Sequence, residues 1–561
     1  MAQKKVVDLR ILQTSDVHGS FFPYNFVTRK PTKGSLASVS TYVNELRKKM
    51  GKNVIMLENG DILQGQPSNY YYNFLHPEKE NVASQVVNYI GYDAQSVGNH
   101  DVETGHAVYD KWIQELDCPT LGANIVDAAT GRPYLKPYTI IERDGVKIAV
   151  IGMLTPAIPN WLNESLWKGL RFEEMVECAK YWVDFVQKYE HPHIIAGLFH
   201  SGRDGGITTP DYSEDESKKV AEEVDGFDVI FYGHDHFTHN EIFKNKNTGK
   251  EVIGIDPSCN AHWLSDVSIS VTFEDGKMVD KKLKGELVNM DEVPANPEYM
   301  AHFEGVINEM NEFVNRQIGE FKAPMHSRDC FFGNAAFTDF IHEIQLKLTG
   351  ADISFNAPLL FNTTIDKGPV YVSDMFKLYK YENKVYVLKM TGEEVRKHLE
   401  LSYDLWVNTM KSPKDHIMML DNNYKGDMQR YGFKNLTFNF DSAMGIDYEV
   451  DVTKPDGQKV RILRMSNGQP FDEKKVYKVA MNSYRGNGGG ELLTRGAGIP
   501  LDKIKDRIVF QSEKDQRYYL MKEIEKQKVM TPKANNNWKF VPEKWTKGAV
   551  KRDKELIFGK R

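Results

Sequence analysis

Residues 227–236 read FDVIFYGHDH, a short apolar run that ends abruptly in a glycine and two histidines. Similar runs recur through the first 280 or so residues. They are VDLRILQTSD at 7–16, KNVIMLENGD at 52–61, VKIAVIGML at 146–154 and HPHIIAGLFHSG at 191–202. Each has the length of a buried strand with a polar loop at its carboxyl end. Between the runs, residues 35–50 and 172–190 place apolar side chains every three or four positions, which is typical of helices. Strands that alternate with helices predict a layered α/β domain.

The chain has 561 residues, a length that favours two or three domains. After the first domain, a Pro-rich start and a long amphipathic pattern predict a linker helix. Beyond it, strand-like segments such as KVYVLKMTG at 384–392 predict a second, smaller α/β domain. The last stretch is lysine-rich but contains Trp538, Phe540 and Trp545, so we expect a tail that packs on the surface through its aromatic rings. The predicted boundaries are 1–290, 291–328, 329–530 and 531–561.

Net charge and hydropathy limit the classes of partner that this chain can have. The net charge is −6, with acidic and basic residues interspersed, so no broad positive field exists to hold a nucleic-acid polymer. No apolar run approaches the roughly 20 residues that cross a bilayer. The N-terminus lacks an apolar signal core, but a leader that was removed and replaced by Met1 would fit AQKK. We therefore expect a periplasmic or cell-envelope protein if a leader was removed, and a cytoplasmic one otherwise. Oligomeric state stays open.

Five polar motifs end the predicted strands: SDVHG, NGD, GNHD, LFHSG and GHDH. Their imidazole, carboxylate and amide groups form a mixed nitrogen and oxygen set that suits divalent zinc, manganese, cobalt or iron. Seven ligands exceed the need of one ion, but with Asp61 as a bridge they supply four contacts to each of two ions. Unrelated polar residues at loop starts are the alternative, and the glycines beside the ligands argue against it. The candidate ligands are Asp16, His18, Asp61, Asn99, His200, His234 and His236.

In this order, D-x-H, G-D, G-N-H, a lone histidine and G-H-x-H resemble the calcineurin-like metallophosphoesterase superfamily. The whole chain, apart from its last stretch, resembles the two-domain 5'-nucleotidase and 2',3'-cyclic nucleotide phosphodiesterase family. The resemblance implies a β-sandwich flanked by helices, joined by the linker helix to a nucleotide-binding domain. It also implies two divalent cations. Asp16, His18, Asp61 and His236 would hold one, and Asp61 with Asn99, His200 and His234 would hold the other.

Paired cations lower the pKa of a bound water, and the resulting hydroxide attacks phosphorus in line. The leaving sugar oxygen then needs a proton or a hydrogen-bond donor. By the resemblance His100, next to the ligand Asn99, is that donor, and a carboxylate three positions later orients it, which here is Glu103. Asp101 is a weaker candidate for the same task.

The second domain should hold the rest of the substrate. Matching the family's motifs residue by residue points to Tyr381 and Tyr484 as an aromatic pair that stacks on the base. Asn356 and Arg485 are polar neighbours that would contact base or sugar. The segment NAPLLFNT at 356–363 stands where 5'-nucleotidases carry G-G-I-R, so the chain looks more like the branch that opens 2',3'-cyclic nucleotides and then removes the 3'-phosphate. 5'-Monophosphates stay open as substrates.

Two other functions remain open at this point. The same metal site would serve another ester, such as a dinucleotide, a nucleotide sugar or a sulfur ester. A non-catalytic nucleotide-binding or surface module is the third possibility, against which the intact ligand set argues.

Overall fold

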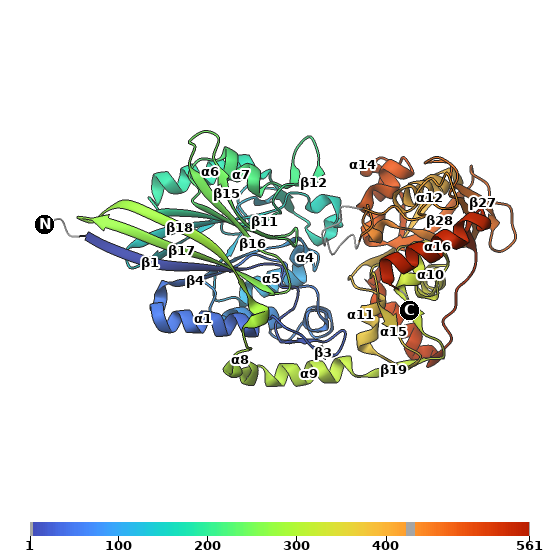
Figure 1. Ribbon diagram of the computed structural model, residues 1–561, viewed down its shortest axis with the longest axis horizontal. Coiled ribbons are helices and arrows are strands. Elements are labelled where there is room, and N and C mark those ends of the chain that lie inside the picture. The colour runs from blue at the N-terminus through green and yellow to red at the C-terminus, as the bar shows by residue number, and fades with distance from the viewer. Residues whose placement is uncertain (1–3, 422–431, 560–561) are drawn as a thin grey trace. The chain divides into compact units, whose positions relative to one another are not determined.

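The computed structural model describes residues 4–421 and 432–559. The chain divides into two compact units, Met1–Glu312 and Phe313–Arg561. Figure 1 follows the elements of each unit along the chain. Within the described ranges, no helix is both long enough and apolar enough to cross a bilayer.

The first unit contains two six-stranded sheets. The first sheet has the order β18-β17-β1-β4-β5-β6 and the second β15-β16-β14-β11-β9-β8. In the first, the bounds are β1 Lys4–Thr14, β4 Val54–Glu58, β5 Ala94–Ser96, β6 Thr120–Leu121, β17 Trp263–Glu274 and β18 Lys277–Asn289. In the second, they are β8 Tyr138–Arg143, β9 Val146–Leu154, β11 Ile194–His200, β14 Val229–Tyr232, β15 Thr238–Lys244 and β16 Glu251–Pro257. Strands β1, β4, β5 and β6 run parallel, as do β9, β11, β14 and β16.

The two sheets face each other across a shared apolar core. Ile11 of β1, Leu57 of β4 and Val150 of β9 belong to one buried cluster. The next residue of β9, Ile151, points to the opposite face, where it joins Val183 of a covering helix. Every second side chain of β9 thus faces the partner sheet and the others face helices. The layered α/β fold predicted from the sequence, a β-sandwich flanked by helices, is confirmed.

Helices and short strand pairs surround this sandwich. The contacts place α1 against β4, α6 against β9 and α7 against β14 and β16. Helix bounds are α1 Leu36–Met50, α2 Pro67–Tyr70, α3 Val82–Ile90, α4 Asn99–Val102, α5 His106–Glu115, α6 Met175–Tyr189 and α7 Ser217–Glu223. The strand pairs are β2 Tyr24–Asn25 with β3 Lys30–Pro31, β7 Ile125–Asp127 with β10 Leu170–Phe172, and β12 Gly205–Thr208 with β13 Ser213–Asp215.

The predicted linker helix over 291–328 is wrong as a single element. The structure forms two helices, α8 Pro297–His302 and α9 Glu304–Val314, and then strand β19 Gln317–Phe321. The break falls at Phe303, which is 1% exposed and packs against Phe22 with ring centroids 5.8 Å apart. The interruption is a single residue, and helical periodicity alone does not reveal it.

The second unit is built around a five-stranded sheet of order β25-β21-β28-β24-β29. Its strands are β21 Ile353–Asn356, β24 Lys384–Thr391, β25 Ser442–Met444, β28 Val476–Asn482 and β29 Ile508–Asp515. Smaller sheets are formed by β19 with β23 Gly368–Tyr371 and β30 Val529–Met530, by β20 Met325–His326 with β22 Thr364–Ile365, and by β26 Ile446–Asp451, β27 Val460–Met465 and β31 Trp538–Val541. The helices are α10 Ala336–Thr349, α11 Val372–Leu378, α12 Gly392–Trp406, α13 Ser483–Gly486, α14 Leu501–Arg507, α15 Gln516–Gln527 and α16 Glu543–Phe558.

The C-terminal segment belongs to the core of the second unit. Strand β31 pairs in parallel with β26, and α16 follows it. Trp538 and Phe540 are each 5% exposed and pack around Tyr403 and Trp406. Burying two large aromatic rings makes this segment part of the fold, whereas the sequence led us to expect a tail on the surface.

Candidate metal centre

The seven predicted ligands gather at one edge of the β-sandwich. The first sheet contributes the loops after β1, β4 and β5, and the second contributes the end of β11 and the loop after β14. Because the carboxyl ends of parallel strands meet at the same edge, residues more than 200 positions apart become neighbours. Two groups have ligand atoms that all lie within 4.8 Å of one another: Asp16, His18, Asp61 and His236, and Asp61, His200 and His234.

The first group surrounds the carboxylate of Asp16. His236 Nε2 lies 3.3 Å from Asp16 Oδ1 and 3.1 Å from His18 Nε2. His18 Nε2 in turn lies 3.8 Å from Asp61 Oδ2. Two imidazole nitrogens that face each other at this separation need a shared proton or a shared cation between them.

The second group shares Asp61. His200 Nε2 lies 3.3 Å from Asp61 Oδ2 and 3.1 Å from Asn99 Oδ1, which adds the predicted amide ligand to the group. His234 is held by its backbone N–H, which donates to Asp16 Oδ2 at 3.0 Å. The Asp61 carboxylate therefore lies between the two sets of ligands, as a bridging group must.

The backbone around these ligands is strained. Asp16, His18, Asp61, His234 and His236 all adopt positive φ, between 47° and 89°. Such conformations are costly for residues with a Cβ and concentrate at functional sites. Gly98 permits a close approach, because a Cβ there would lie 2.1 Å from Asp61 Oδ1. The glycines that border the motifs thus let two loops meet at the bridge.

Backbone carbonyls set the orientation of two rings. His200 Nδ1 lies 2.7 Å from the carbonyl oxygen of Asn59, and His18 Nδ1 lies 3.1 Å from that of Gln64. An N–H at Nδ1 that donates to a carbonyl leaves the lone pair on Nε2, the nitrogen that faces the cluster. Both supporting residues follow β4, and the sequence analysis did not single them out.

Electrostatics also favour bound cations. Burial opposes the charge of Asp61, yet His200 and His100 hold its pKa well below the usual value. Burial lowers the pKa of His200, but the charges of Asp61 and Asp16 outweigh this effect and raise it to about 10. Burial lowers the pKa of His18 to about 3, so this ring is neutral at pH 7 and has a lone pair to donate. Two ionised carboxylates in a dry site require positive charge nearby.

The residues fit divalent cations. Asp16 Oδ1 is buried and accepts no well-formed hydrogen bond within the described part of the chain. The donor set around it mixes imidazole nitrogens with carboxylate and amide oxygens, which is the chemistry expected for zinc, manganese, cobalt or iron. A buried carboxylate oxygen that faces imidazole nitrogens without a well-formed hydrogen bond is satisfied by a metal ion.

His100 pairs with Glu103 and not with Asp101. His100 Nδ1 lies 2.6 Å from Glu103 Oε2, so the side chain three positions later reaches the ring. Asp101 is fully buried, and its carboxylate accepts four backbone N–H groups, those of Gly98, Asp61, Ile62 and Leu63. The suggested orienting role of Asp101 is therefore wrong. Adjacent side chains in a helical turn point about 100° apart, whereas side chains three positions apart lie on the same face. Asp101 is therefore directed toward the loop of residues 61–63, and Glu103 lies beside His100.

A further carboxylate that the sequence analysis missed lies beside His234. Glu214 Oε1 is 2.9 Å from His234 Nε2, and Trp161 packs on the same ring with centroids 5.6 Å apart. Glu214 and Asp215 also form a third potential ligand group with His234. Glu214 stands 20 positions before its partner on an exposed hairpin, and no motif marks it.

Three of the predicted substrate residues meet at one edge of the five-stranded sheet in the second unit. Asn356 ends β21, Tyr484 lies two residues after the end of β28, and Tyr381 lies three residues before β24. Strand β28 pairs with both β21 and β24. Lys384 N donates to Ser483 Oγ at 3.1 Å, so the segments that carry Tyr381 and Tyr484 lie close together. Asn356 Nδ2 is buried and has no hydrogen-bond acceptor among the described residues. Such a donor is available to a ligand or to a water molecule.

All the N–H groups of the Arg485 guanidinium bond other residues of the second unit. It is 2% exposed, and its guanidinium donates to both oxygens of Asp441, at 2.9 and 3.0 Å. The remaining N–H groups bond Asn439 Oδ1 and the carbonyls of Gly489 and Phe438. The expectation that Arg485 contacts base or sugar is wrong, because a buried guanidinium must pair with a carboxylate and the chain supplies one 44 positions earlier.

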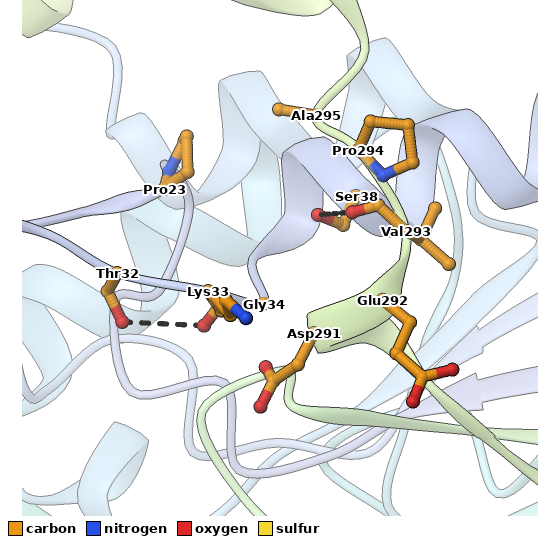
Figure 2. A pocket seen from close by; sticks show the side chains of 10 residues that line it. All are labelled: Pro23, Thr32, Lys33, Gly34, Ser38, Asp291, Glu292, Val293, Pro294 and Ala295. Carbon is orange, nitrogen blue, oxygen red and sulfur yellow. Dashed lines mark hydrogen bonds between the residues drawn. The ribbon is translucent and has the colours of Figure 1, made fainter.

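A separate surface hollow of about 300 Å³ lies elsewhere in the first unit. Figure 2 shows its lining, which comes from the segment around Lys33 and Ser38 and from residues 291–295. Ser38 Oγ donates to the carbonyl of Val293 across it. None of the predicted ligands lines this hollow, so it is not part of the metal centre.

Comparison with known proteins agrees with this geometry. Residues 9–237 match the family described as calcineurin-like phosphoesterase, and residues 317–495 match the 5'-nucleotidase C-terminal domain. The chain is 26% identical to a trifunctional nucleotide phosphoesterase of Bacillus subtilis, covering 96% of this chain but 39% of that protein. It is also 26% identical to a 2',3'-cyclic-nucleotide 2'-phosphodiesterase/3'-nucleotidase of Haemophilus influenzae, covering 96% and 88%. A putative 5'-nucleotidase structure from Staphylococcus aureus shares the fold, with a TM-score of 0.78, 20% identity and coverage of 95% and 100%.

Proposed function

Because this chain belongs to the calcineurin-like phosphoesterases that carry a 5'-nucleotidase C-terminal domain, we propose that it hydrolyses nucleotide phosphate esters with two divalent cations. The observation that carries the proposal is the convergence of seven ligands from five strand ends on Asp61. We propose zinc, manganese, cobalt or iron as the metal, and 2',3'-cyclic and 3'-nucleotides as substrates. If a leader was removed, the reaction takes place in the periplasm or cell envelope.

Each residue of the centre has a place in this reaction. Asp16, His18, Asp61 and His236 would hold one cation, and Asp61, Asn99, His200 and His234 the other. When bound, such a pair polarises phosphoryl oxygens and lowers the pKa of a bound water into the neutral range. Asp61 is fixed for bridging, because His100 N donates to its Oδ1 at 2.8 Å while Oδ2 faces His200.

His100 supplies the proton to the leaving oxygen. Its side chain is 26% exposed at the site, and Glu103 stabilises the protonated ring through Nδ1. The second N–H of that ring, at Nε2, then donates to the oxygen that leaves phosphorus. The dyad thus places a proton donor next to the ligand Asn99.

The second unit provides selectivity. Tyr381 and Tyr484 offer ring faces on which any base stacks, and Asn356 Nδ2 offers a buried donor at the same sheet edge. The segment NAPLLFNT, in place of an arginine-containing loop, favours cyclic and 3'-nucleotides over 5'-nucleotides.

The test is phosphate release from matched 2',3'-cyclic, 3'- and 5'-nucleotides, after chelation and reloading with each of the four metals. We expect release only with added metal, and faster release from the first two classes. No release from any nucleotide with any metal would refute the proposal, and a preference for 5'-nucleotides would refute its substrate assignment.

A further inference from the structure

His234 differs from the other imidazoles of the centre in how its ring is held. His200 and His18 present Nε2 to the cluster, because a backbone carbonyl binds Nδ1. In His234 the bonded nitrogen is Nε2, which lies 2.9 Å from Glu214 Oε1. A neutral ring that donates from Nε2 would carry its lone pair on Nδ1, which is the opposite tautomer from that of His200 and His18.

Glu214 is fixed in place from several directions. Its carbonyl accepts the hydroxyls of Thr155 and Ser201, at 2.8 and 2.9 Å. Its second carboxylate oxygen accepts Ile207 N from the opposite strand of the hairpin, at 2.7 Å. Ser201 directly follows the ligand His200, so the hairpin is joined to the metal centre at two points. Such support preorganises the carboxylate before any cation arrives.

The neighbouring carboxylate does not share this role. Asp215 Oδ1 is 4.0 Å from His234 Nε2, beyond hydrogen-bond distance, and it accepts Gly202 N at 2.7 Å. Trp161 packs against the His234 ring and restricts its rotation. Of the carboxylates on β13, Glu214 is therefore the one that binds the ring.

We propose that Glu214 is a positioning residue that orients His234 and selects its tautomer for the second cation. This proposal rests on the proposed function. Carboxylates that accept the second N–H of a metal-bound histidine raise its basicity, and their loss costs about 10- to 100-fold in metal affinity. The hairpin formed by β12 and β13 would thus be a support for the metal centre, although the residues of β12 are exposed.

The experiment measures cation binding without substrate. Purified full-length protein is stripped with a chelator and titrated with Mn²⁺, and metal content is counted after dialysis. The visible spectrum of the Co²⁺ form reports the ligand set. We expect Glu214→Ala to retain the first cation, to bind the second about 10- to 100-fold more weakly, and to change the spectrum. Glu214→Gln keeps an acceptor for the Nε2 proton and should recover most of the affinity. Asp204→Asn is the control, because this carboxylate, next to the same hairpin, is 52% exposed and pairs with Arg203 and Lys218.

A double-mutant cycle separates positioning from direct ligation. In a His234→Ala background, removal of Glu214 should weaken the second cation by less than twofold further, because the residue acts through the missing ring. Additive losses would overturn the positioning role and make Glu214 a ligand in its own right. Native affinity in Glu214→Ala would overturn the inference and leave the proposed function intact. Fewer than two cations bound by the native chain would refute both.

Discussion

Two carboxylates that are two positions apart, Asp101 and Glu103, should respond differently to replacement by their amides: the first by a loss of stability, the second by a loss of activity. Asp101→Asn and Glu103→Gln each replace a carboxylate by its amide in the loop that carries Asn99 and His100. The structure gives Asp101 four backbone N–H donors, two on each oxygen, at 2.8 to 3.0 Å, whereas it gives Glu103 one imidazole. Asp101 should therefore stabilise the fold of the loop, and Glu103 should act in catalysis through His100.

The magnitude for Asp101→Asn follows from counting donors. The amide nitrogen would face two N–H groups and could accept from neither, so two buried donors would lose their partner. At about 1–3 kcal/mol each, the free energy of unfolding of the first unit should fall by about 2–6 kcal/mol. Burial raises the pKa of Asp101 to about 6, and repulsion from Asp61 adds to the effect. The comparison therefore belongs at pH 8, where the native carboxylate is ionised.

The assay is urea unfolding combined with hydrogen exchange of the amides of residues 61–63 and 98. Asp101→Asn should lose protection at these amides and bind cations more weakly. Glu103→Gln should keep stability, amide protection and both cations, and lower kcat about 10- to 100-fold, a part of the roughly 10²- to 10⁴-fold that general acid catalysis contributes. The reasoning would be refuted if Asp101→Asn stayed within 1 kcal/mol of native with its amides protected, or if Glu103→Gln released a cation.

Three further predictions concern pH and substrate. Against the effect of burial, the pKa of His200 is raised to about 10 by Asp61 and Asp16, and that of His234 to about 9 by Glu214 and Asp215. Two protons must therefore leave before the second cation binds, and its apparent affinity should rise about 100-fold per pH unit between about pH 6 and 8. An affinity independent of pH in a chelator competition would contradict this. Burial lowers the pKa of His342 to about 3, whereas a histidine in the unfolded chain titrates near 6.5. Only the unfolded state therefore binds a proton as the pH falls, and the free energy of unfolding of the second unit should decrease by about 1.4 kcal/mol between pH 7.5 and 5.5. Urea unfolding of His342→Gln should lack this decrease, and a pH profile equal to that of the native protein would count against the argument. Tyr381→Ala and Tyr484→Ala should each raise KM about 5- to 150-fold for nucleotides but not for a base-free sugar phosphate, and equal effects on both substrates would exclude stacking.

The sequence predicted the sandwich and its ligands because both depend on local patterns. Asp16, Asp61 and Asn99 each follow a strand within three residues, and parallel strands bring their ends to a common edge without further information. Helical spacing alone would have identified Glu103, and not Asp101, as the carboxylate beside His100, provided that a helical turn was assumed to follow Gly98.

Other features depend on distant partners and left no local signal. Arg485 is neutralised by Asp441, and Glu214 reaches His234 from a separate hairpin. The linker pattern continues past Phe303, but the helix is interrupted at that residue. The aromatic residues Trp538 and Phe540 looked like surface anchors, although pairing of β31 with β26 places them in the core.

The central claim is that seven side chains hold two adjacent cations, and anomalous diffraction from crystals soaked in Mn²⁺ tests it most directly. Two peaks about 3.5–4 Å apart should appear, with Asp61 between them and His18 and His200 on opposite sides. A single peak, or peaks away from these side chains, would contradict the account.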